Sequence, residues 1–314
     1  MTTDDQVHVA EMDEEGFAAL FDALSTWGRW GEGDECGSLN HADAAAVVEG
    51  ARVVREGRTF GLGHPLDTRA SAHNEEPADY HMTMLGGDAG SGLGFTMDYV
   101  GLDYHHATHS HIDALCHTSY GGSLYNGFAT ASTVTTDGAA SLSVEALKDG
   151  LVGRGVLLDV PGLRDRRWLE PGENVFREDL EAAERAQGVT VDAGDILLVR
   201  TGHGRRLAEL GDADAGGSVA GLHPTAMTFV ADRRVIALGS DGNSDTAPSA
   251  SPGVAFPIHV LALNAMGVHL MDYLALEDLR DACISSGRWD FLFVAAPLRI
   301  EGGTGSPINP IAIT

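Results

Sequence analysis

The chain has 314 residues, of which 43% are hydrophobic and 21% are charged. This composition is typical of a globular protein with an ample core, and it excludes collagen-like, coiled-coil and largely disordered chains. The 46 acidic residues outnumber the 20 basic ones and give a net charge of −26, which repels phosphate backbones and anionic headgroups. We therefore expect a small-molecule substrate or a cation as ligand, no nucleic-acid partner and no membrane partner.

The first third of the chain predicts helices followed by loops. Residues 11–30 show apolar positions at helical spacing, and residues 41–56 predict a second helix with Asn40 as its N-terminal cap. The glycine-rich stretch 63–94 is typical of loops. We predict a single domain overall, with an N-terminal helical arm over residues 1–60 and the main body over 61–314.

From residue 150 onward, short apolar runs alternate with helical segments. The runs 155–160, 195–200, 234–239 and 291–296 have the length of buried strands, and residues 177–187 and 223–232 predict helices. Buried strands that alternate with helices indicate an α/β fold.

Cysteine content and the N-terminus bear on the compartment. Three scattered cysteines are too few for a disulfide framework, and their odd number suits a reducing environment. The acidic N-terminus does not have the basic and apolar pattern of a signal peptide, and no apolar run approaches the roughly 20 residues of a membrane span. We expect a soluble cytoplasmic protein.

The densest chemistry lies in residues 103–117, where five histidines and two aspartates occur within 15 residues. If this stretch is extended, alternate residues share one face of the strand. That face would carry His105, His109, His111, Asp113 and His117. A lone histidine is usually an ordinary surface or core residue, but imidazole and carboxylate groups at this spacing suit a zinc, manganese or iron(II) site with positions open for water.

The pattern His111-x-Asp113-x-x-x-His117 resembles the H-x-G-T-H-x-D-x-x-x-H signature of the cyclase-like metal-dependent hydrolases, the superfamily of kynurenine formamidase and isatin hydrolase. Segments 27–40, 125–127, 239–241 and 305–310 resemble further patterns of its longer bacterial members. The resemblance implies an α/β fold of the cyclase-like (swivelling β/β/α) type, a mixed β-barrel with flanking helices over the catalytic domain. It also implies a homodimer or homotetramer.

Carried over by position, the resemblance makes His111 and Asp113 metal ligands and His117 the general base. The family's first ligand falls on Ala107, so another histidine must replace it. We prefer His109, because H-x-H is a compact chelate, and keep His105 as the alternative if the backbone bulges. The implied cofactor is a divalent metal, zinc or manganese.

A later histidine and acid complete a second metal position in some relatives, and His259 and Asp272 lie at about that spacing. Aspartate is shorter than the usual glutamate, so we expect His259 to act in catalysis, facing the substrate or the metal-activated water. Asp272 has a helix N-cap as its alternative role.

The implied function is hydrolysis of a small amide, cyclic amide or lactone, on C–N bonds other than peptide bonds, by metal-activated water with a histidine base. A metal-dependent lyase, dehydratase or cyclase acting on a small biosynthetic intermediate is the alternative, and a non-catalytic metal-binding protein is a third. Arg200 and His203 are candidates to orient a substrate carboxylate, although a structural ion pair fits Arg200 equally well.

Overall fold

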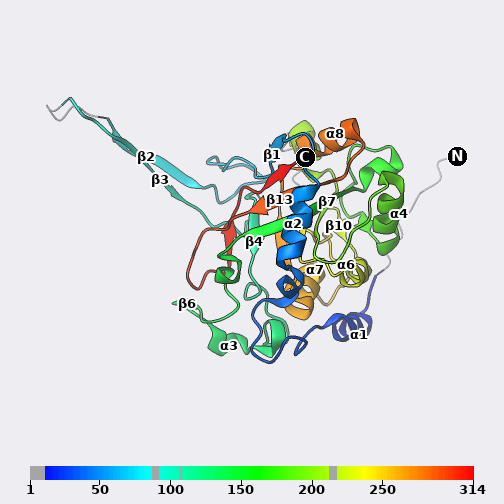
Figure 1. Cartoon of the computed structure of the whole chain (residues 1–314). Coiled ribbons are helices and arrows are strands. Elements are labelled where there is room, and N and C mark those ends of the chain that lie inside the picture. The colour runs from blue at the N-terminus through cyan, green and yellow to red at the C-terminus, as the bar shows by residue number, and fades with distance from the viewer. Residues whose placement is uncertain (1–10, 87–91, 107, 212–217) are drawn as a thin grey trace.

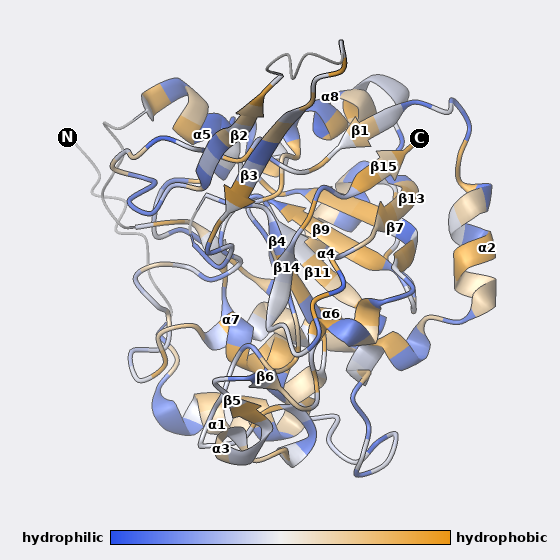
Figure 2. Ribbon diagram, turned by 90° about the vertical axis from the view of Figure 1, so that its left-hand side faces the viewer, coloured by the Kyte–Doolittle hydropathy of each residue, from blue (hydrophilic) through white to orange (hydrophobic). Residues whose placement is uncertain are grey.

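The computed structural model describes residues 11–86, 92–106, 108–211 and 218–314. Its centre is a mixed nine-stranded sheet with the order β1-β15-β13-β7-β9-β11-β12-β4-β14, curled into a half-barrel and flanked by helices (Figure 2). The predicted mixed α/β fold is confirmed, with the sheet open at its two edge strands, β1 and β14.

The strands of this sheet are β1 (Thr59–Gly61), β4 (His111–Asp113), β7 (Leu151–Asp159), β9 (Ile196–Arg200), β11 (Ala237–Ser240), β12 (His269–Asp272), β13 (Asp290–Ala295), β14 (Gly305–Pro307) and β15 (Ile311–Ile313). The central strands β7, β9, β11 and β12 run parallel to one another, whereas β4 is antiparallel to β12. Parallel strands are buried on both faces, which explains why their sequences are continuous apolar runs. The predicted runs 155–160, 195–200, 234–239 and 291–296 overlap β7, β9, β11 and β13.

The main helices are α1 (Glu14–Leu24), α2 (Ala44–Arg52), α4 (Arg177–Gln187), α5 (His203–Leu210), α6 (Met227–Arg233) and α8 (Glu277–Ser286). Shorter helical segments are α3 (Thr130–Thr133), α7 (Pro257–His259) and a π-helical segment η7 (Val260–Met266). The predicted helix 177–187 coincides with α4. The cap of α2 is Asp43 instead of Asn40, because the Asp43 carboxylate accepts the backbone N–H of Ala46 at 2.8 Å.

The predicted N-terminal arm lies against the rest of the chain. Helix α1 packs on η7 and α6, with Phe17 fully buried, and α2 packs on β7 and β13. Strand β1 spans the predicted boundary at residue 60 and pairs with β15. Among the described residues, no helix is both long and apolar enough to cross a membrane.

The predicted loop 63–94 is wrong in part, because it contains one strand of a long hairpin. Strands β2 (Asp79–Leu85) and β3 (Thr96–Gly101) pair only with each other, and Figure 1 shows them projecting from the body of the protein. The rest of the predicted glycine loop falls partly on residues 87–91, which lie outside the described part of the chain.

An ion-pair network joins β9 to α8. Arg200 has no exposed surface, and its guanidinium lies 2.8 Å from the carboxylates of both Asp159 and Glu277. Arg280 contacts the second oxygen of Asp159 at 3.0 Å. Of the two roles expected for Arg200, the structure therefore supports the structural ion pair, because protein carboxylates already bind its guanidinium.

We predict that Arg200→Met destabilises the protein by about 3–5 kcal/mol, because breaking a buried ion pair leaves Asp159 buried with one partner fewer. The free energy of unfolding in urea measures the loss. Arg185→Met is the control: Arg185 is exposed and 4.0 Å from Glu181, so its loss costs below about 1 kcal/mol. Equal stability of the two variants would contradict the structural role of Arg200.

Candidate metal centre

Strand β4 holds two predicted ligands on one face. Residues two apart in a strand point the same way, so His111 and Asp113 lie together, with His111 Nε2 3.5 Å from Asp113 Oδ1. Nδ1 of His105 lies 2.9 Å from the same carboxylate oxygen. One ligand atom from each of these three residues lies within 4.8 Å of the others, and Asp113 is completely buried.

His105 reaches the site through a turn, not through a strand. The extended conformation predicted for 103–117 is confined to 111–113, and residues 104–106 turn back so that the His105 ring faces Asp113. Thr304 fixes that ring by a hydrogen bond of 2.9 Å between its Oγ1 and His105 Nε2. Ala107, on which the family's first ligand falls, lies outside the described residues.

His109, the preferred replacement ligand, lies outside this cluster. It is buried, and neither of its ring nitrogens has a hydrogen-bond partner in the described part of the chain. Its backbone carbonyl accepts a 2.7 Å hydrogen bond from Nδ1 of His111. This bond fixes the tautomer of His111, so that Nε2 carries no proton and its lone pair faces Asp113. Metal-bound histidines commonly have such a hydrogen-bond partner on their other ring nitrogen.

A second group of side chains shares Asp113 with the first. Asp113, His117 and His259 also bring ligand atoms within 4.8 Å of one another, and His259 Nε2 is 3.6 Å from Asp113 Oδ2. The rings of His117 and His105 stack with centroids 3.9 Å apart and an interplanar angle of 9°. The structure thus brings together five of the six predicted site residues, with His109 outside.

His259 sits where α7 passes into η7, between two carboxylates. Its Nδ1 lies 2.6 Å from Asp245 Oδ2, and its Nε2 lies 3.4 Å from Asp272 Oδ2. Asp272 ends β12 and accepts a 2.7 Å hydrogen bond from Ser244. The alternative role of Asp272 as a helix cap is wrong, because α8 begins at Glu277.

Asp245 is a site residue that the sequence reasoning missed. It follows the predicted strand 234–239, and side chains after the carboxyl end of a parallel strand commonly line a site in α/β proteins. The position after a predicted strand was therefore a signal for Asp245 in the sequence. It did not connect Asp245 with His259, because no fixed number of residues separates two such groups.

The environment separates the pKa values of the two catalytic candidates. Burial lowers the pKa of His117 to about 4. Burial would also lower the pKa of His259, but Asp245 and Asp272 outweigh it and raise that pKa well above its usual value. At neutral pH and without metal, His117 is therefore neutral and His259 is cationic.

The orphaned polar atoms at this site fit a cation. Both oxygens of Asp113, Nδ1 of His105 and Oδ2 of Asp272 are buried without a well-aligned hydrogen bond among the described residues, although Nδ1 of His105 lies 2.9 Å from Oδ1 of Asp113. Burial would raise the pKa of Asp113, but the histidines around it, led by His105, hold that pKa below its usual value, so the carboxylate is ionised. Two imidazoles and a carboxylate are donors that suit zinc or manganese.

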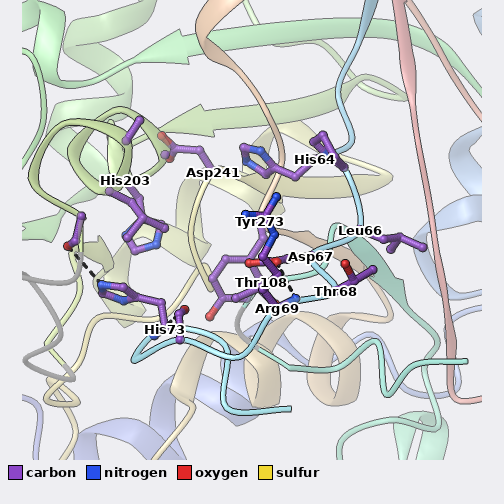
Figure 3. Close-up of a pocket in the computed structure, with 16 residues that line it drawn as sticks. His64, Leu66, Asp67, Thr68, Arg69, His73, Thr108, His203, Asp241 and Tyr273 are labelled. Atoms are coloured by element: carbon purple, nitrogen blue, oxygen red, sulfur yellow. Dashed lines mark hydrogen bonds between the residues drawn. The ribbon is translucent and has the colours of Figure 1, made fainter. Parts of the chain in front are cut away.

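A cavity of about 600 Å³ lies between the loop 64–73 and α5 (Figure 3). Tyr273 lines it, and its ring centroid is 6.3 Å from that of His111 and 6.1 Å from that of His203. Tyr273 therefore lines the cavity and also lies near His111 of the metal centre. His203, a predicted substrate contact, lines the cavity with His73, whereas Asp241 at its edge accepts the backbone N–H groups of 201 and 202.

His269 supports the centre from β12. It has no exposed surface, and its Nδ1 lies 2.9 Å from the carbonyl oxygen of Asp113. Burial lowers the pKa of His269 to about 4. Because His269 holds the backbone of β4 from the neighbouring strand, its protonation state affects the stability of the strand that carries the ligands.

We predict that the metal-free protein loses stability as the pH falls from 6.5 toward 4, because an unfolded histidine binds a proton there and buried His269 does not. At pH 5 this residue contributes a loss of about 2 kcal/mol. His269→Gln keeps a donor for Asp113 but removes this titration, so denaturant unfolding at pH 7 and pH 5 should show a smaller loss in the variant. An identical pH dependence in both proteins would refute the assignment.

Comparison with known proteins agrees with the geometry. Residues 60–245, more than half of the chain, match the family model Cyclase, described as "Putative cyclase". The crystal structure of a novel cyclase is 30% identical, with a TM-score of 0.85 over 94% of this chain and 99% of that chain.

Two isatin hydrolases are similar at lower identity. The enzyme of Roseibium aggregatum is 28% identical over 142 residues, which is 43% of this chain and about half (51%) of that curated relative. Isatin hydrolase A from Labrenzia aggregata, solved with benzyl benzoate bound, is 20% identical, with a TM-score of 0.57 over 81% of this chain and 93% of that chain, a likeness of fold. The resemblance expected from the His111-x-Asp113-x-x-x-His117 pattern is confirmed, and the chain belongs to the Cyclase family.

Proposed function

We propose that this protein is a metal-dependent hydrolase that cleaves the C–N bond of a small amide or cyclic amide, or the ester bond of a lactone. One observation carries the proposal: the completely buried Asp113 carboxylate has three histidine rings around it and no well-aligned hydrogen bond on either oxygen. A buried carboxylate whose oxygens lack hydrogen bonds is costly, so this arrangement of ligand atoms suits a bound cation. The similarity to isatin hydrolase, whose name indicates a cyclic amide, supports the choice of substrate class.

The ligands that we propose are His105, His111 and Asp113, with zinc or manganese as the ion. His105 takes the place that the sequence assigned to His109, because its ring nitrogen is 2.9 Å from Asp113 and no ring nitrogen of His109 belongs to the cluster. When bound, such an ion polarises a carbonyl and lowers the pKa of a water molecule.

Two histidines supply the proton transfers. His117 is neutral at pH 7, so it can accept a proton as general base. His259 carries a proton that Asp245 and Asp272 stabilise, so it can donate to the departing nitrogen or oxygen. Neighbouring groups with pKa values displaced in opposite directions commonly divide the base and acid roles in this way.

The cavity beside Tyr273 suits the remainder of a small substrate. A volume of about 600 Å³ lies within the range of small-molecule sites. Its lining combines histidines, Leu66 and Leu207 with one acid and one base of opposite charge, Asp67 and Arg69, while Asp241 is engaged with the backbone before α5. We therefore propose a small, neutral or weakly anionic substrate.

The ligand assignment predicts different outcomes for two neighbouring histidines. His105→Ala should lower the bound metal well below one ion per chain and abolish hydrolysis of isatin or N-formyl aryl amides. His109→Ala is the matched control, because the carbonyl that orients His111 remains, and it should keep its metal. Metal analysis of the purified proteins decides: metal lost from His109→Ala but not from His105→Ala would reverse the assignment.

The base assignment predicts that His117→Gln retains the metal and lowers kcat by roughly 10²–10⁴-fold, the contribution typical of general acid–base catalysis. Metal analysis together with steady-state kinetics tests this. Loss of the ion would make His117 a ligand instead of a base. The product mass of the parent enzyme identifies the reaction, since hydrolysis adds the mass of water and a lyase or dehydratase does not.

A further inference from the structure

A second pocket, of about 170 Å³, lies where α1 and α6 meet the segments 25–41 and 266–268. Figure 1 shows α1 and α6 at the same end of the molecule. Val235 and Val268 line the pocket just before β11 and β12, so it lies at the amino ends of these parallel strands. Asp272 of the metal centre ends β12. The pocket and the metal centre therefore lie at opposite ends of the same strands, and they share no residue.

The charged side chains of this pocket are all basic. Arg29, His41 and Arg234 line it, and no aspartate or glutamate of the described residues does so. Although the chain has 46 acids, neither arginine forms an ion pair in the described part of the chain, whereas the neighbouring Arg233 pairs with Glu184 at 2.7 Å. Both arginines are exposed, so a ligand from solution can reach them. Two guanidinium groups without a counter-ion at one small pocket favour an anionic ligand.

The backbone at Arg234 is strained. This residue ends α6 in the left-handed conformation, with φ of 52°. Helices α4 and α8 end in the same conformation but use Gly188 and Gly287, which adopt it without a steric cost. An arginine at such a position points to a role for its side chain.

Trp30 gives the pocket an aromatic wall between its basic groups. The guanidinium carbon of Arg29 lies 5.2 Å from the centroid of the Trp30 ring, and the ring of His41 meets Trp30 edge-on at 5.3 Å. Burial lowers the pKa of His41, and the charges of Arg29 and Arg234 lower it further, so both arginines act on the same imidazole. The remaining large side chains of the lining are apolar: Leu24, Val230, Val235, Met266 and Val268.

We propose that this pocket binds a small organic carboxylate whose body is no larger than a single ring. The two arginines bind the carboxylate, because the guanidinium fork matches its two oxygens, while Trp30 and the apolar side chains contact the body of the ligand. A cavity of roughly 150 Å³ accepts benzene, so 170 Å³ has room for one ring. Inorganic phosphate has no apolar part to place against this wall. The site does not depend on the metal or on the proposed hydrolase function.

Titration of the metal-loaded protein with benzoate tests the proposal, with calorimetry for the affinity and the NMR signals of the Trp30 indole and the His41 ring for the location. We expect saturable shifts of both signals. Benzamide, which has nearly the same shape without the charge, should bind at least about tenfold more weakly.

The double variant Arg29→Gln/Arg234→Asn should also weaken benzoate binding at least about tenfold. Asparagine tolerates the left-handed backbone, so we expect an unchanged unfolding temperature. Arg55→Gln is the matched control: among the described residues the Arg55 guanidinium contacts only the backbone carbonyls of 52 and 54, and this variant should bind benzoate as its parent does.

Four results would overturn the proposal. Unmoved Trp30 and His41 signals would do so, even if benzoate binds at the metal centre, and so would equal affinities for benzamide and benzoate. A double variant with the affinity of its parent would exclude the arginines. Inorganic phosphate that binds as tightly as benzoate would exclude an organic carboxylate as the preferred ligand. None of these measurements depends on catalytic activity, so their failure is distinct from failure of the hydrolase proposal.

Discussion

The Asp113 carboxylate is fully buried, and the local structure is arranged around this charge. Strand β4 is held between β12 and β14, which removes Asp113 from water, while three histidine rings face its two oxygens within 3.6 Å. Burial alone would favour a protonated acid, but the surrounding imidazoles keep it ionised. A divalent cation would satisfy the lone pairs that hydrogen bonds leave free.

A second pair of carboxylates gives the site its asymmetry. Asp245 and Asp272 contact His259 but not His117, so the two histidines on either side of Asp113 differ in proton affinity. The backbone also orients the histidines, because the carbonyls of 109 and 113 accept hydrogen bonds from the Nδ1 atoms of His111 and His269. The pairing of the strands therefore affects the tautomers of these histidines and, through them, the charge of the site.

The fold was predictable from the sequence where local pattern and tertiary burial agree. The buried runs of β7, β9 and β11 are apolar on both faces, and α4 has a regular helical period ended by Gly188. The hairpin was missed because glycines between and beside its strands resemble a loop, although alternating apolar residues in 80–84 were a strand signal.

The site was predictable only where the ligands share one strand. His111 and Asp113 lie two residues apart on β4, so the two-residue period of a strand is enough to place their side chains on the same face. The choice between His105 and His109 depended on a turn at 104–106, and single-sequence periodicity does not reveal where a strand begins. Asp245 is brought to His259 by the tertiary fold, and no spacing in the sequence indicates that contact.

Anomalous diffraction from crystals of the protein grown with zinc or manganese shows whether a divalent ion binds at Asp113. We expect one strong peak within bonding distance of His105, His111 and Asp113. A peak at the exposed cluster of Glu76, Asp103 and His106, which also brings ligand atoms together, with none at Asp113, would contradict it.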